Sequence, residues 1–186
     1  ATSVVDSEAQ QKLGLVDGAS AYWRWNVDAN SPGKLEVTAD QVTFTSDDTA
    51  TVTSDVDLVD GVHEWTLECV QLRGPMSRNF RAGFVPSGWN SGEVLGNDNQ
   101  KAFGVLALGS NYVGMQKMNV LEGKGLSENF ETGSILDFSL DFTTKTLRVT
   151  HNRGLSQVLE FPDLEGPVRP AISFYYAQPQ VVRVIG

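Results

Sequence analysis

The stretch that decides the fold is LVDGVHEWTLEC, residues 58–69, in which a glycine turn leads into a segment with two chemically sorted faces. Side chains alternate across a β-strand, so every second residue lies on the same face. The mostly apolar face comprises His63, Trp65, Leu67 and Cys69, and the polar face comprises Glu64, Thr66 and Glu68. This pattern predicts a half-buried strand with one face on a core and the other in water.

The same alternation recurs along the chain and is interrupted by turn-forming residues. In 135–149, apolar and polar residues alternate, stop at Thr143-Thr144-Lys145 and resume, as in an antiparallel hairpin. The chain has 18 glycines and 7 prolines, with no helical apolar stripe and no repeat of fixed period. So many one-sided strands predict an all-β fold of two antiparallel sheets packed face to face. We expect strands over 21–27, 34–38, 41–45, 49–54, 62–70, 79–85, 102–108, 111–116, 134–142, 145–151, 156–160, 170–176 and 180–185.

The segment 46–61 is unusually rich in aspartate and threonine. Its alternating threonines predict an edge or solvent-facing strand over 49–54. Asp55, Asp57 and Asp60 precede Gly61, but the register does not place oxygen ligands where a calcium loop needs them. We therefore expect a solvated acidic loop.

Composition limits the function classes. The 186 residues suit one domain, and the net charge of -9 with a pI near 4.6 disfavours direct binding of nucleic acid or anionic membranes. No apolar run approaches the roughly 20 residues of a membrane-spanning helix. Cys69 is the single cysteine, so no internal disulfide forms, and the polar first residues carry no secretion signal. We expect an intracellular piece of a longer protein, monomeric as an isolated domain.

Several motifs follow one another along the chain: Trp25-Asn26, the Gly61-Val62-His63-Glu64-Trp65 turn and strand, FRAGFV at 80–85, FGV at 103–105, GSIL at 133–136 and RPAIS at 169–173. In this order they resemble the SPRY domain family, whose members are protein-interaction modules. The chain departs from the family pattern at Ser134, where aspartate is usual, and at Arg153, which splits the Asn-Gly turn. The resemblance implies a bent two-sheet antiparallel β-sandwich of the concanavalin A-like class over 21–186, preceded by an N-terminal extension over 1–20.

The resemblance also implies where a partner binds. In SPRY domains that bind peptides, the groove draws on loops at one end of the sandwich and on the end of the P-A-v-S strand. The matching positions in this chain are Asn30, Ser31, Asp57, Val59, Ser87, Trp89, Tyr175 and Tyr176. Trp89 lies in a turn-rich loop, where it either anchors a partner or packs back over the sandwich edge.

The sequence therefore predicts a non-catalytic module that binds a protein or peptide. It offers no catalytic constellation, no cofactor motif and no metal-ligand spacing. One alternative is a lectin-like sugar-binding domain, which loop residues such as Trp89, Asn97 and Asn99 would suit. A glycoside hydrolase is less favoured, because Glu64 and Glu68 share a strand face with Cα atoms about 13 Å apart, whereas paired catalytic carboxyl groups approach to roughly 5 to 10 Å.

Overall fold

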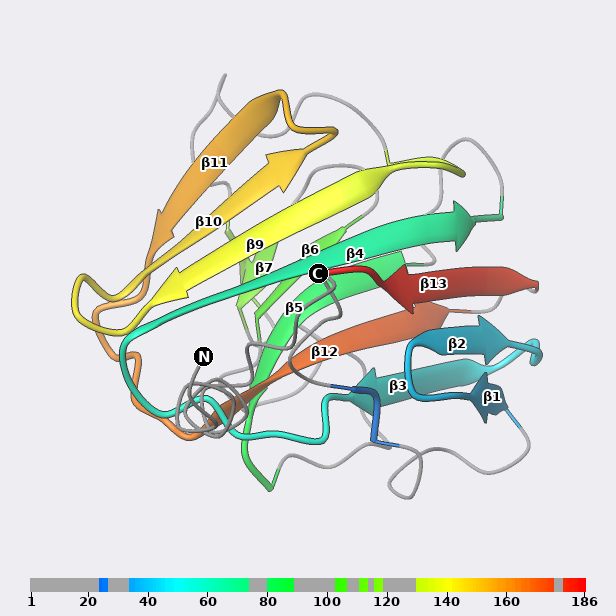
Figure 1. The fold of residues 1–186 in the computed structure, drawn as a ribbon, viewed down its shortest axis with the longest axis horizontal. Coiled ribbons are helices and arrows are strands. Elements are labelled where there is room, and N and C mark those ends of the chain that lie inside the picture. Colours follow the sequence, from blue (N-terminus) through cyan, green and yellow to red (C-terminus); the bar gives the residue numbers. More distant parts are fainter. Residues whose placement is uncertain are drawn as a thin grey trace, which may run out of the picture.

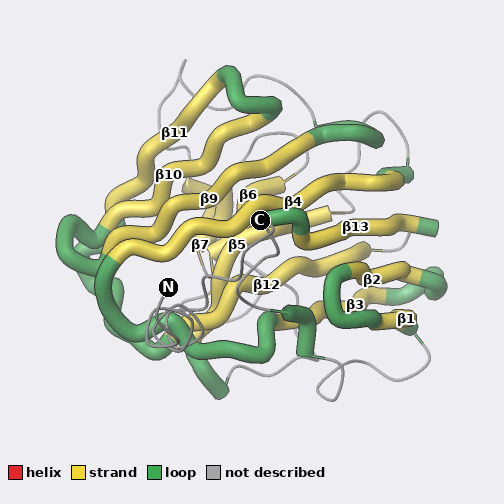
Figure 2. The backbone as a smooth tube through the Cα atoms, in the orientation of Figure 1, coloured by secondary structure: helices red, strands yellow, loops and turns green. Residues whose placement is uncertain are grey.

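The computed structural model describes residues 24–26, 34–73, 80–88, 103–106, 111–113, 116–118, 130–175 and 179–186. Within these ranges the chain consists of strands and loops, without a helix (Figure 2). The all-β prediction is confirmed. The expected N-terminal extension over 1–20 lies outside the described residues.

The strands form two antiparallel sheets, one in front of the other in Figure 1. The seven-stranded sheet has the order β1 (Leu35–Val37), β2 (Gln41–Phe44), β13 (Gln180–Val184), β4 (Val62–Gln71), β9 (Ile135–Asp141), β10 (Thr146–His151) and β11 (Leu155–Glu160). The six-stranded sheet has the order β3 (Thr49–Thr53), β12 (Val168–Tyr175), β5 (Phe80–Pro86), β6 (Phe103–Leu106), β7 (Asn111–Val113) and β8 (Gln116–Met118). This is the face-to-face sandwich that the alternating pattern predicts.

Aromatic residues fill the space between the sheets. Trp65 of β4 and Phe138 of β9 lie opposite each other in register and stack with ring centroids 5.0 Å apart. Phe44 of β2 stacks at 5.2 Å on Phe174, which belongs to β12 in the other sheet. All four are buried, so they remove from water much of the apolar surface that stabilises the fold.

The hairpin of β9 and β10 forms as expected. Leu147 pairs with Leu140, and Lys145 takes a left-handed backbone conformation, with φ 54°, in the turn between the strands. The Asp141 carboxylate accepts backbone N–H groups at 2.8 Å from Thr143 and at 3.2 Å from Thr144. These hydrogen bonds, chiefly those from Thr144, lower the pKa of Asp141.

Three local expectations need correction. The single strand expected over 111–116 is two short strands, β7 and β8. β3 is an edge strand as predicted, but Thr51 is buried rather than solvent-facing, and its hydroxyl hydrogen-bonds Ser173 at 2.7 Å. β5 is buried on both faces, because Arg81 and Val85 are buried as well as the core-facing residues of that strand.

The predicted first strand and the predicted core histidine are also only partly realised. Within the expected strand 21–27, Trp25 is buried and makes an isolated bridge to Ser54, while 21–23 and 27 lie outside the described residues. His63 is half-buried rather than in the core. Its Nε2 lies 2.5 Å from the Asp60 carbonyl, and its ring meets Phe142 edge-on.

The last strand joins two parts of the seven-stranded sheet. β13 lies between β2 and β4, and the main chain continues beside β4 as far as the carbonyl of Gly186, which accepts the N–H of Thr66 at 2.5 Å (Figure 1). On the outer face, the guanidinium of Arg183 in β13 pairs with Glu68 in β4, with its Nε 3.1 Å from the carboxylate. The β1–β2 hairpin is thus attached to the rest of this sheet through β13.

Candidate binding site

Three segments meet at one end of the sandwich: the loop before β4, the end of β5 and the start of β12. Leu58 and Val168 form an isolated bridge in which each N–H donates to the carbonyl of the other, at 2.8 and 2.9 Å. Ser87 donates its backbone N–H to the Pro167 carbonyl at 2.9 Å. These main-chain bonds hold the loop ends in fixed positions.

The Asp57 carboxylate is the polar centre of this end. It accepts the Nε–H of Arg169 at 2.5 Å. That hydrogen bond is the main cause of a lowered Asp57 pKa; partial burial opposes the shift, and a hydrogen bond from Ser87 adds to it. Asp57 therefore ties together the three segments and is not the purely solvated acid expected from the sequence.

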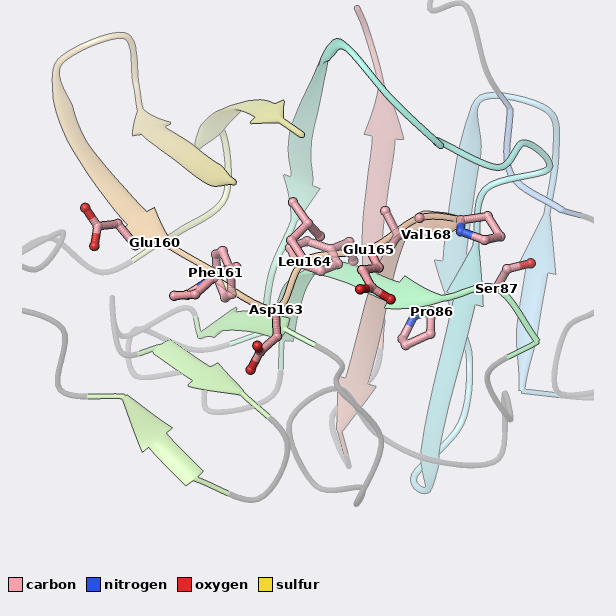
Figure 3. Close-up of a pocket in the computed structure, with 12 residues that line it drawn as sticks. Pro86, Ser87, Glu160, Phe161, Asp163, Leu164, Glu165 and Val168 are labelled. Carbon is pink, nitrogen blue, oxygen red and sulfur yellow. The ribbon is translucent and has the colours of Figure 1, made fainter. Parts of the chain in front are cut away.

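A pocket of about 550 Å³ lies beside these segments, where the loop 161–167 between β11 and β12 passes over the end of β5 (Figure 3). Its volume falls within the roughly 300 to 1,000 Å³ of ligand pockets. The Phe161 ring meets Phe84 edge-on at 5.5 Å, and Leu164 and Val168 are buried. The remaining apolar lining consists of the prolines Pro86, Pro162 and Pro167.

Acidic side chains stand around this apolar lining. Glu160, Asp163 and Glu165 line the pocket and are exposed. In Figure 3 the carboxylates of Asp163 and Glu165 leave the loop on the same side. Lys145 braces the loop by donating its Nζ to the Pro162 carbonyl at 2.9 Å.

The loop is also fitted closely to the segment before β4. A Cβ on Gly166 would lie 2.8 Å from both the Cα and the carbonyl oxygen of Val59, so any side chain there would require backbone movement. Val59 itself is 56% exposed beside the loop. An exposed valine next to an apolar pocket extends the surface that a partner could cover.

The structure brings together only some of the residues that the resemblance assigns to a site. Asp57, Val59 and Ser87 meet at the pocket end. Tyr175 does not: it ends β12 opposite Thr49, seven residues from Val168 and therefore about 23 Å along the strand. The expectation of a single shared end is wrong for Tyr175. The other four, Asn30, Ser31, Trp89 and Tyr176, lie outside the described residues.

Sequence reasoning missed the loop that forms most of the pocket. In FPDLEGP, residues 161–167, two prolines and a glycine mark a loop. The available signal was the pair of large apolar residues, Phe161 and Leu164, in a segment that turn formers keep from being a strand. Their partner Phe84 is 77 residues away from Phe161 in the chain, so the pocket itself is a tertiary feature.

A second, polar hollow of about 270 Å³ lies on the outer face of the seven-stranded sheet. Glu64 and Asp137 both line it, and the Thr66 hydroxyl donates to the Asp137 carboxylate at 2.6 Å. Glu68 does not line this hollow and is paired with Arg183. The two glutamates considered for a hydrolase therefore do not face each other across one cavity.

Other chemistry is limited in the part of the chain that the structure describes. No group of three or more His, Cys, Asp or Glu residues there is arranged to hold a metal ion. No helix among those residues is long and apolar enough to cross a membrane. Cys69 is buried, and this burial, with a smaller contribution from Glu68, raises its thiol pKa to about 12.

Two stacked antiparallel sheets with loops gathered at their ends define a β-sandwich, and comparison with solved structures identifies its type. The SPRY domain of human HERC1 covers 84% of this chain and 96% of its own length, with a TM-score of 0.68 and 16% identity. The TRIM65 PSpry domain covers 97% of this chain and 99% of its own length, with a TM-score of 0.65 and 11% identity. A further human SPRY domain covers 82% of this chain and 94% of its own length, with a TM-score of 0.53 and 13% identity.

The chain therefore has the SPRY fold, as the order of its motifs predicted. At these identities the likeness establishes the fold alone. Sequence comparison gives no match to a family model or to a curated protein.

Proposed function

We propose that the chain is a non-catalytic protein-interaction module of a larger intracellular protein. It recognises a peptide or a segment of a folded surface at the end of the sandwich that carries Asp57, Val59 and Ser87. The observation that carries this proposal is the apolar pocket at that end, lined by buried aromatic and aliphatic side chains and open to a partner. Its geometry resembles a pocket that takes an anchoring side chain.

Preorganisation supports a binding role. The pocket loop is held by the hydrogen bond from Lys145, by the hydrogen bond that the Pro167 carbonyl accepts and by the close fit of Gly166. The Leu58–Val168 bridge and the hydrogen bond between Arg169 and the Asp57 carboxylate connect the neighbouring segments. A surface that is already ordered loses little conformational entropy when it binds. The affinity of such a site then depends on the apolar contact and not on folding of the loop.

Affinity capture from cells with a pocket-blocking variant tests the proposal. Pro162→Trp adds a large ring at an exposed position of the pocket wall, and Glu36→Trp adds the same ring to exposed β1 at an edge of the seven-stranded sheet. We expect Pro162→Trp to lose captured proteins that wild type and Glu36→Trp retain, with both variants melting like wild type. If Tyr175→Ala loses the captured proteins and Pro162→Trp retains them, the binding site lies at the other end of β12.

The two alternatives have separate tests. A glycan array with and without calcium tests the lectin-like function. Hydrolysis assays on Glu64→Gln, Glu68→Gln and Asp137→Asn test a glycosidase. We expect neither glycan binding nor activity that these substitutions remove; a positive result in either assay would replace the proposed function.

A further inference from the structure

The pocket combines an apolar lining with a rim whose charged residues, within the described part of the chain, are all acidic. Glu160, Asp163 and Glu165 are exposed around it. Two cations that bond to this end of the sandwich already have partners there: Lys145 donates to the Pro162 carbonyl and Arg169 donates to Asp57. The net charge of the chain, -9, adds a negative background to this local field.

We infer that the pocket binds a protein segment in which an apolar side chain is flanked by lysine or arginine. The inference rests on the proposed function and names the chemistry of the partner. The apolar side chain would enter between Phe84, Phe161 and Leu164, and the flanking cations would reach the carboxylates of the rim.

The spacing of the rim fits this arrangement. Asp163 and Glu165 flank Leu164 in the chain, and they are exposed whereas Leu164 is buried. Two residues of chain span at most about 7 Å, so cations one or two positions before and after the anchoring residue come within reach of both carboxylates. An acidic residue in either place would meet like charge at short range.

The apolar lining and the negative charges of the rim contribute differently to recognition. Burial of an apolar side chain supplies affinity for many partners, because it is not directional. Charges at the rim select among those partners and speed association. The module should therefore discriminate between segments of equal hydrophobicity by the charge beside the anchor.

Selection from a random twelve-residue peptide library tests the inference. The 186-residue chain is immobilised, and the same library is selected in parallel on Pro162→Trp. We expect the peptides enriched on wild type, and not on the variant, to share one large apolar residue with lysine or arginine within two positions. A pool that is neutral or acidic around the apolar residue would overturn the basic-partner inference and leave the proposed function standing.

If wild type enriches no peptides beyond those that Pro162→Trp enriches, the pocket does not select peptides. That result would overturn both the basic-partner inference and the proposed function. These outcomes separate failure of the partner chemistry from failure of the site.

Fluorescence anisotropy with the most enriched peptide then isolates the rim. The double variant Asp163→Asn/Glu165→Gln removes two exposed charges, and Glu36→Gln/Glu131→Gln removes two exposed charges elsewhere. We expect the first pair to weaken binding about fivefold, since exposed ion pairs change equilibrium constants by about two- to fivefold each, and the control pair to change it little. Raising the salt from about 0.05 to 0.5 M should diminish the difference. Equal affinity for both double variants would overturn the inference.

Discussion

The Asp57 carboxylate provides the sharpest test of how the pocket end is held together. Asp57→Asn keeps the size of the side chain and its ability to accept a hydrogen bond, but removes the charge that Arg169 contacts at 2.5 Å. We expect the variant to be less stable than wild type at neutral pH. We also expect its pocket loop to exchange backbone amide hydrogen faster, because Ser87 and Arg169 lose a common charged partner.

The size of the effect follows from the exposure of the pair. Hydrogen bonds to charged groups contribute about 1.5–3 kcal/mol, whereas fully exposed ion pairs contribute about 0–1 kcal/mol. The side chains of Asp57 and Arg169 are 38% and 28% exposed, between these limits, so solvent screening reduces the larger figure. We expect a loss of about 1–2 kcal/mol, which for a urea slope of about 2 kcal/mol per M lowers the unfolding midpoint by about 0.5–1 M.

The pH dependence gives an independent check. The pKa of Asp57 is lowered in the folded chain from its ordinary value of 3.8. Its stabilising contribution is therefore fully present above the unfolded pKa and is lost as the pH falls through the folded pKa. The difference between wild type and Asp57→Asn should stay constant from about pH 7 to 5 and vanish in strong acid.

A double-mutant cycle with Arg169→Gln shows whether the pair itself is responsible. Each single variant should cost about the same, and the double variant should cost little more than either. Additive effects of the two substitutions, or an Asp57→Asn protein as stable as wild type at pH 7, would refute the view that this ion pair holds the pocket end.

Three further outcomes are expected. Gly166→Ala should lower stability by about 1–3 kcal/mol, because its Cβ would meet the Val59 backbone at 2.8 Å, whereas Gly154→Ala, whose Cβ has no neighbour closer than 3.6 Å, should melt like wild type. Cys69 should resist alkylation at pH 8 in the native chain and react on unfolding; rapid native labelling would contradict its burial. Phe138→Ala should cost about 3–5 kcal/mol in urea unfolding, since it empties a stacked, buried position; a loss below about 1 kcal/mol would contradict that packing.

The strands were predictable because local alternation coincides with tertiary burial over most of the sandwich. In β4, the apolar residues Trp65, Leu67 and Cys69 are buried and the polar residues between them are not, as the sequence pattern predicts, whereas His63 at the start of the strand is only half-buried. Alternation did not predict burial in β5, where neighbouring segments cover both faces of the strand and Arg81 is buried. It also failed for Thr51, which is buried because its hydroxyl hydrogen-bonds Ser173. The alternation of polar and apolar residues shows the chemistry of the two faces of a strand, but it does not show which faces of the sheet are exposed to solvent.

The candidate site was less accessible to sequence reasoning. Motif order located the segments of Asp57 and Ser87, which do meet. It could not show that β12 carries Tyr175 to the opposite end, because the direction of each strand within the sandwich depends on the topology. The pocket depends on a contact between Phe84 and Phe161 that no local pattern encodes.

The position of β13 has a consequence for how the molecule matures on the ribosome. β13 completes the hydrogen bonding of β4, which lies inside the sheet, so the β1–β2 hairpin, which belongs to the first described segments, cannot attach until β13 has been synthesised. Contacts of such long sequence separation form slowly. The seven-stranded sheet therefore cannot close until β13 has been synthesised, and a nascent chain that stalls before β13 leaves one edge of β4 unpaired.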